Sequence, residues 1–382
     1  MKAIIVLLVC SLLLTGCWDL KTVQDMNIVT ALGIDYKKDH YIVYVKLTDF
    51  SAVGTREGSG ESKPASTWIG IGEGSTVLLA INDVYRSAQH HTLWTHVKAI
   101  VITKSALGKL EDIFDSLLRS RELRYTSWVY GTDKPITSIF TADTTLNQSP
   151  LLLEMFEPKE TYKQRSAVLP IQLQQLVSSI REPATSVLLP VLSVTDRKWV
   201  ANQKDKTPSM MELTGVFVIN KGANEGWVAE KDMMGARLIR YSHLVRYPLN
   251  LPEPIGGNNT LNLTSPSTKI SLNPDTSDSI NLNINLTVNA TVLETHDTKG
   301  FAATDHAMEQ KAQAILKEDI LKEFNDAKSK HIDLFGFEEW LYRHHYDLWK
   351  QTVSRGPVLS KIKVDDVKVK VLIKHANTYT ID

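Results

Sequence analysis

The stretch INLNINLTVNATV, residues 280–292, alternates apolar and polar side chains without interruption. This period of two is typical of a β-strand with one buried face and one face in water. Residues 305–330 then carry a single apolar stripe at helical spacing, made of Ala312, Leu316, Ile320 and Phe324. We therefore predict a sheet whose dry face is covered by one long helix.

The elements around this strand predict an α+β domain over residues 209–382. The segment LTGVFVIN, residues 213–220, is predicted to open the domain as a strand, and residues 248–259, rich in Pro, Gly and Asn, are predicted to form a loop. Residues 362–373 alternate as a closing strand, but their pattern shifts by one residue at Asp365-Asp366. A bulge or turn at that point would restore the register.

The first half of the chain alternates predicted strands with predicted helices. Strands are expected at residues 27–35, 41–50 and 97–103, and helices at residues 76–90 and 110–123. Such alternation is typical of α/β packing. We predict an α/β region over residues 17–195, with an optional division into two subdomains near residues 145–165.

A polar segment separates the two halves. Residues 196–208, DRKWVANQKDKTP, end in proline and are the best candidate for a linker. The predicted fold class is therefore a multi-domain chain, mixed α/β and α+β, whose mixed β-sheets are each covered by helices.

The N-terminus has the pattern of an export signal. Apolar residues from Ala3 to Leu14 precede the sequence LTGC, which ends at Cys17. The run is shorter than the ~20 apolar residues needed to span a bilayer. It resembles the lipobox of bacterial lipoproteins, in which the cysteine is lipidated after residues 1–16 are removed. The alternatives are an ordinary signal peptide with a chance cysteine and an uncleaved anchor.

Composition excludes some classes of partner and of covalent structure. Lys+Arg and Asp+Glu both total 43, so there is no net basic field for nucleic acid. The other cysteine, Cys10, lies in the predicted signal. The mature chain would therefore hold a single cysteine and no internal disulfide.

No motif indicates catalysis, a cofactor or a metal. Gly70-Ile-Gly72-Glu-Gly74 has the wrong spacing for a phosphate-binding loop, and a tight connection from strand to helix is preferred. The clustered histidines lack zinc-site spacing; they are His90, His91, His96, His344 and His345. We predict no catalytic, cofactor-binding or metal-ligating residue, and only one modified residue, Cys17.

The order of several segments resembles the Ger(x)C lipoproteins, the C subunits of spore germinant receptors. The resemblance covers nearly the whole mature chain. The segments that carry it are GCWD (16–19), IVTALGID (28–35), TWIGIGEGSTVLLAINDVYRSAQ (67–89), RSRELRYTSWVYGT (119–132) and HIDLFGFEEWLYRHHYDLWK (331–350).

The resemblance implies a non-enzymatic lipoprotein on the outer face of the inner spore membrane. It would work there with a polytopic A subunit and a transporter-like B subunit, anchored to the bilayer through acylated Cys17. The main alternative is the solute-binding lipoprotein of an importer, which would need two similar lobes around a cleft. An extracytoplasmic hydrolase is a third class.

Overall fold

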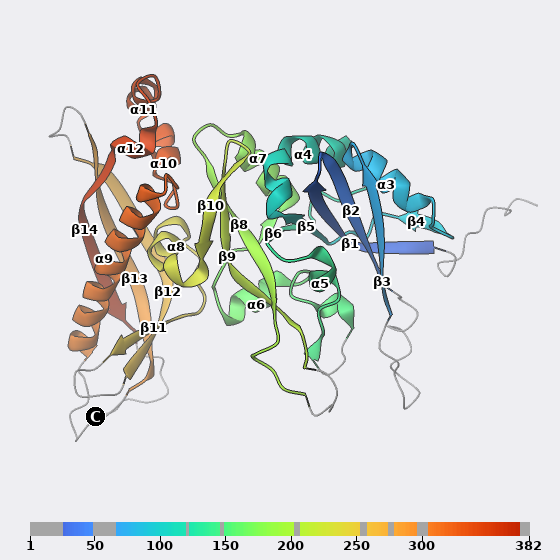
Figure 1. Cartoon of the computed structure of the whole chain (residues 1–382). Coiled ribbons are helices and arrows are strands. Elements are labelled where there is room, and N and C mark those ends of the chain that lie inside the picture. The colour runs from blue at the N-terminus through green and yellow to red at the C-terminus, as the bar shows by residue number, and fades with distance from the viewer. Residues whose placement is uncertain are drawn as a thin grey trace, which may run out of the picture.

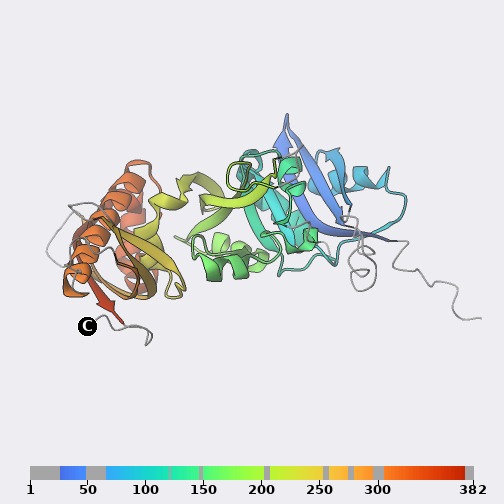
Figure 2. The ribbon, with the colours of Figure 1, turned by 90° about the horizontal axis from the view of Figure 1, so that it is seen from below.

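The computed structural model describes residues 26–48, 66–119, 122–145, 149–201, 207–252, 258–273, 279–295 and 305–374. Within these residues the chain forms a ten-stranded sheet and a four-stranded sheet, each packed with helices. The two units lie side by side along the long axis of the molecule (Figures 1 and 2). The predicted fold class is confirmed.

The first sheet has the strand order β10-β9-β8-β6-β5-β1-β2-β3, with β4 added to β1 and β7 added to β6. Strands β1, β5, β6 and β8 run parallel to one another, and the remaining neighbours on this path are antiparallel. The bounds are β1 Met26–Lys37, β2 His40–Thr48, β3 Thr67–Gly74, β4 His91–Leu93, β5 Ala99–Thr103, β6 Trp128–Thr132, β7 Ile171–Gln172, β8 Ser186–Thr195, β9 Met210–Asn220 and β10 Ala223–Ala229.

Helices cover both faces of this sheet because its central strands are apolar on both sides. All five residues of β5 are buried, as expected of a parallel strand between two helical layers. One face packs against α3 (Val77–Tyr85), α4 (Leu110–Arg119) and α7 (Leu173–Arg181). The other face packs against α5 (Ile136–Phe140) and residues 153–156. The same unit also contains the short helices η3 (Lys104–Lys109), η5 (Pro150–Leu152) and α6 (Pro158–Gln164).

The second sheet has the order β11-β12-β13-β14. Its dry face packs against α9, the long helix in front of it in Figure 1. The helices α10 and α11 lie at the upper end of this unit in the same view. The bounds are η6 Glu230–Asp232, α8 Met234–Arg240, β11 Tyr247–Pro252, β12 Asn258–Leu272, β13 Ile280–Glu294, α9 Asp305–Ser329, α10 Phe337–His344, α11 Tyr346–Val353, α12 Val358–Lys361 and β14 Ile362–Ile373.

The strand predicted at residues 280–292 and the long helix predicted after it are confirmed. In β13, every second side chain from Ile280 to Ala290 is buried, and the predicted stripe of α9 is buried against the sheet. In β14, Leu282 pairs with Val364 while Asn283 pairs with Asp366. Asp365 is therefore the extra residue of the predicted bulge.

The strands around the predicted linker belong to a single sheet. Strands β8 and β9 flank residues 196–208 and pair antiparallel along their lengths. The structure thus assigns β9 and β10 to the first sheet, whereas the sequence placed them with the second half. The physical reason is that most of β8 is buried, and buried backbone N–H and C=O groups need hydrogen-bond partners, which β9 supplies along its second edge. Residues 202–206 of the segment lie outside the described residues.

Two further differences concern the domain limits and the predicted loop. The optional division near residues 145–165 falls between β6 and β8, which are neighbours in the first sheet. The sheet therefore continues across that point. The loop predicted at residues 248–259 contains most of β11, and β12 was not predicted at all.

Candidate functional site

Several buried charged groups lie at the junction of the two sheets, among them Arg237 and Asp333. Strand β9 contributes to two cores: Val216 and Val218 pack with the second sheet, while Phe217 and Ile219 pack with the helices of the first. Because successive side chains of a strand point to opposite faces, one strand serves both units. The polar groups around it determine how the units are held together.

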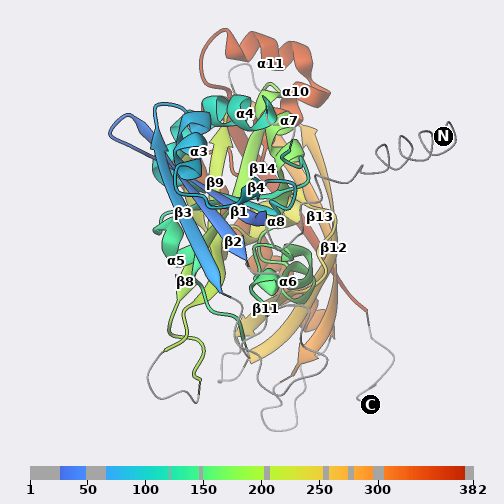
Figure 3. The same cartoon turned by 90° about the vertical axis from the view of Figure 1, so that its right-hand side faces the viewer.

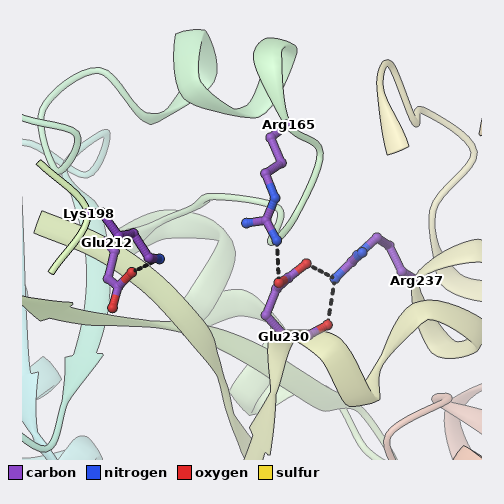
Figure 4. Close-up of polar contacts among 5 residues, drawn as sticks. All are labelled: Arg165, Lys198, Glu212, Glu230 and Arg237. Carbon is purple, nitrogen blue, oxygen red and sulfur yellow. Dashed lines mark hydrogen bonds and ion pairs between the residues drawn. The ribbon is translucent and has the colours of Figure 1, made fainter. Parts of the chain in front are cut away.

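Glu230 connects three segments at this junction. Its carboxylate accepts a hydrogen bond from Arg165 at 2.6 Å and one from Arg237 at 3.4 Å (Figure 4). Its backbone oxygen accepts a second bond from Arg237 at 3.2 Å. Arg165 follows α6, Glu230 lies between β10 and α8, and Arg237 lies within α8. One carboxylate therefore ties a loop of the first unit to the helix that begins the second.

Arg237 is a buried cation. It is 1% exposed, and its guanidinium lies 4.5 Å from the ring centroid of Tyr247. Its Nε and Nη1 atoms have no hydrogen-bond partner among the described residues. Burying a cation costs free energy. Here the Glu230 carboxylate and the Tyr247 ring offset part of that cost.

A second ion pair contains a carboxylate that affects a neighbouring carboxyl group. Lys198 pairs with Glu212 of β9 across the β8–β9 hairpin (Figure 4). Burial raises the pKa of Glu154 to about 7, the negative charge of Glu212 adds to this, and Arg165 opposes it. The carboxyl of Glu154 therefore has a protonation state that is sensitive to pH near neutrality.

A chain of buried hydrogen bonds ties β8 to α10. Arg240 donates to the backbone oxygen of Ser186 at 2.6 Å, and the Ser186 hydroxyl donates to the backbone oxygen of Asp333 at 2.6 Å. The Asp333 carboxylate then accepts the backbone N–H groups of Phe337 at 3.0 Å and Glu338 at 2.9 Å. Burial raises the pKa of Asp333, and these N–H groups oppose the shift. The arrangement positions α10 against the first sheet.

Glu323 connects α9 to α8. It is 8% exposed and accepts the backbone N–H of Ala236 at 3.1 Å. Burial raises the pKa of Glu323 to about 7, while backbone N–H groups at the start of α8 lower it in part. Protonation of this carboxyl is therefore coupled to the packing of the two helices.

Replacing Glu323 by glutamine should make stability less dependent on pH. The folded pKa of about 7 lies above the ordinary value of 4.5. The contribution of this group to stability is thus complete below pH 4.5 and lost as pH rises through about 7. At pH 8 Glu323→Gln should raise the free energy of unfolding by up to about 3 kcal/mol, with little change at pH 4.

Urea denaturation at both pH values would measure this effect. Glu318→Gln, on the exposed side of the same helix, is the matched control and should change neither value. A Glu323→Gln variant less stable than the wild type at pH 8 would show that the charged form supports the fold.

Three hollows in the described surface carry charge. One lies between β10 and α9, beside Glu323, with a volume of about 300 Å³. A second, of about 340 Å³, is lined by Glu225, Asp333 and Glu338 together with Lys221. A third, of about 610 Å³, lies at the carboxyl ends of β1, β5 and β6 and is lined by both lysine and aspartate. No group of three or more His, Cys, Asp or Glu side chains among the described residues could hold a metal ion.

The clustered histidines lie in two places, His90 and His91 in the first unit and His344 and His345 against Trp340 in the second. His344 packs on the Trp340 ring, with centroids 5.2 Å apart, and its Nδ1 lies 2.8 Å from the backbone oxygen of Trp340. His90 lines an apolar groove near β1, and His91 begins β4. The one predicted modification site, Cys17, lies outside the described residues.

The glycine triplet belongs to an edge strand. Gly70, Gly72 and Gly74 are part of β3, and α3 lies directly against this strand. A Cβ on Gly72 would stand 2.2 Å from the backbone oxygen of Ala80 in α3. The glycines therefore allow a helix to approach a strand closely. The sequence placed these glycines in a tight connection between a strand and a helix, whereas the structure places them within the strand, just before the helix.

The junction residues were missed by sequence reasoning. Arg165, Glu230 and Arg237 are ordinary charged residues in the sequence, with no spacing that distinguishes them. Their segments meet through the pairing of β8 with β9 and through hydrogen bonds between Ser166 and residues 245–246. No helix in the described ranges is long and apolar enough to cross a bilayer.

Two family models match the chain. Residues 19–194 match the spore germination protein N-terminal domain, and residues 214–377 match the spore germination B3/GerAC-like C-terminal domain. The gap between the two matches contains the predicted linker.

Several relatives come from Bacillus subtilis (strain 168). The putative spore germination protein YfkR is 25% identical over 259 residues, which cover 67% of this chain and 65% of YfkR. Spore germination protein KC is 20% identical over 368 residues, covering 91% of this chain and 88% of that protein. Spore germination protein A3 is 27% identical over 143 residues, covering 36% and 37%. This chain therefore spans just under two thirds of YfkR and most of KC.

The fold also matches a solved structure. The crystal structure of the GerBC protein superposes with a TM-score of 0.54 at 14% sequence identity, covering 90% of this chain and 96% of that one. The two matched family domains, the spore germination relatives and this shared fold agree. The chain belongs to the Ger(x)C family of spore germination proteins.

Proposed function

We propose that this chain is a lipoprotein subunit of a nutrient germinant receptor and that it has no enzymatic activity. It would be held on the outer face of the inner spore membrane by lipid on Cys17, and it would serve receptor assembly and signalling during germination. Its partners would be the A and B membrane subunits of the receptor. The observation that carries the proposal is family membership in both halves of a chain whose apolar N-terminal run ends at LTGC.

The buried charged groups support a role in holding surfaces rather than in catalysis. Glu323 binds the backbone of α8, Asp333 binds the backbone of α10, and Arg240 binds the backbone of β8. Each of these groups thus connects one element to another. Such bonds hold these elements in place, and the Arg240 bond to β8 also holds the second unit on the first sheet, which suits a protein that must present a defined surface to partners.

The importer alternative fits the structure poorly. A solute-binding protein of that class needs two similar lobes around a ligand cleft. In the described residues one sheet has ten strands and the other has four, with different strand orders. No pair of matching lobes is formed by these two sheets.

Crosslinking in isolated spore membranes would test the proposal. A tagged full-length chain, expressed from its own locus, should crosslink to two polytopic proteins encoded beside it. Spores that lack the gene for the proposed A subunit are the control and should lose that product. Recovery of a permease and an ATPase in place of the two subunits would support the importer and contradict the receptor.

A further inference from the structure

An apolar groove of about 580 Å³ lies where the first sheet begins. Its walls include Met26, Ile28, Val45, Leu47, Trp68 and Val84. Leu47 pairs with Val29 on one side and with Trp68 on the other, so the start of β1, the end of β2 and the start of β3 share one edge of the sheet. Figure 3 shows β3 and α3 at this end of the molecule.

The groove differs from the three charged hollows in its chemistry. None of its lining residues is Asp, Glu, Lys or Arg, whereas each of the other three hollows is lined by both lysine and carboxylate side chains. The Trp68 ring on its wall is 70% exposed. An exposed tryptophan beside an uncharged apolar groove is a surface suited to an apolar or interfacial partner.

Only a short segment of chain separates the groove from Cys17. Met26 follows Cys17 by nine residues, and a chain of that length spans at most roughly 30 Å in any conformation. If Cys17 carries lipid, this edge of the sheet stays within that distance of the bilayer. Val200 follows β8, which is separated from β3 by β6, β5, β1 and β2 in the strand order, or about 24 Å across the sheet.

We propose that this groove rests on the bilayer surface, with the Trp68 ring among the lipid headgroups. The inference depends on the lipid anchor of the proposed function and adds the face that the anchor brings to the membrane. Tryptophan is favoured at that depth because its ring is apolar and its N–H is polar. Since the groove carries no ionised lysine, arginine or carboxylate, contact requires no anionic lipid and is insensitive to salt.

A lipid-quenching experiment tests the orientation. The lipidated full-length chain is placed on phosphatidylcholine vesicles that contain brominated acyl chains. A thiol-reactive fluorophore is attached to Trp68→Cys or, as a second variant of the same wall, to Ser66→Cys. Cys17 is the only mature cysteine and is blocked by lipid, so each variant offers one free thiol. Val200→Cys is the matched control, because Val200 is 96% exposed and follows β8, which four strands separate from β3.

The expected result is at least a threefold stronger quenching at positions 68 and 66 than at position 200, unchanged between low and high salt. Equal quenching at all three positions, with the protein still bound to vesicles, would overturn the orientation and leave the anchor intact. Failure of the protein to float with vesicles would overturn the anchor and this inference with it.

Two other occupants of the groove give their own signatures. If a segment of this chain fills it, the fluorophore at position 66 is shielded from aqueous iodide even without vesicles. If a partner protein fills it, shielding appears only in native spore membranes and brominated lipid has no effect. Either result would overturn the proposal.

Discussion

Replacement of Cys17 by alanine is expected to abolish fatty-acid labelling of the mature chain and to remove most nutrient-triggered germination. The thioether to lipid needs this sulfur, and the other cysteine, Cys10, lies within the predicted signal. Burial of acyl chains contributes about 0.8 kcal/mol per CH₂, and stable anchoring needs two signals rather than one chain. The variant would therefore leave the membrane.

Loss of the anchor should act by lowering the effective concentration of the domain near its membrane partners. A tether raises the effective concentration of a domain near its membrane partners toward the millimolar range, so a weak interface suffices while the tether is present. An exported variant without lipid should restore little germination. The same ectodomain retethered by a foreign transmembrane helix should recover much of it.

Metabolic labelling and a germination assay would measure both effects. Cys10→Ala is the matched control and should keep label and germination, because residue 10 would be removed with the predicted signal. Triggers that bypass nutrient receptors should work in every strain. Retention of label by Cys17→Ala, or full germination by the untethered chain, would contradict the assignment.

Replacement of Gly72 by alanine should destabilise the first unit by about 3 kcal/mol or more. The new Cβ would stand 2.2 Å from the backbone oxygen of Ala80 and 2.8 Å from the backbone nitrogen of Val84. Those atoms belong to α3, so relief requires the helix to move off the strand. Such a movement opens the core beneath α3 and displaces Val84 from the wall of the groove.

Gly108→Ala provides the same chemical change without the clash. A Cβ at Gly108 meets nothing within 4 Å. Its effect should stay within about 0.5 kcal/mol, as for most surface substitutions. Chemical denaturation of the two variants would give the comparison. Equal stability would show that α3 is not in close contact with β3.

The second unit was largely predictable because its pattern is local. The alternation of β13, the stripe of α9 and the shift at Asp365 each depend on side chains a few positions apart. The burial of one face dictates such periods, so they appear directly in the sequence. The Ger(x)C family was recognised for a similar reason, since the order of several short segments is also a property of the linear chain.

The first unit shows a feature that local patterns do not predict, namely which sheet a strand joins. The sequence indicated that residues 213–220 form a strand, and the structure confirms it as part of β9. No local signal indicated which sheet that strand would join. The strand joins the first sheet because it follows β8 in the chain and pairs with it along the edge opposite β6.

The apolar run, the position of Cys17, the family and most strands and helices were determined by the sequence alone, because each depends on neighbouring residues. Tertiary structure decided three other features. These are the passage of the first sheet across the predicted linker, the burial of Arg237 between Glu230 and Tyr247, and the uncharged groove beside Trp68. Each joins residues far apart in the chain, and which distant residues meet depends on the packing of whole strands and helices. That packing is a collective property of the fold and leaves no periodic trace in the sequence.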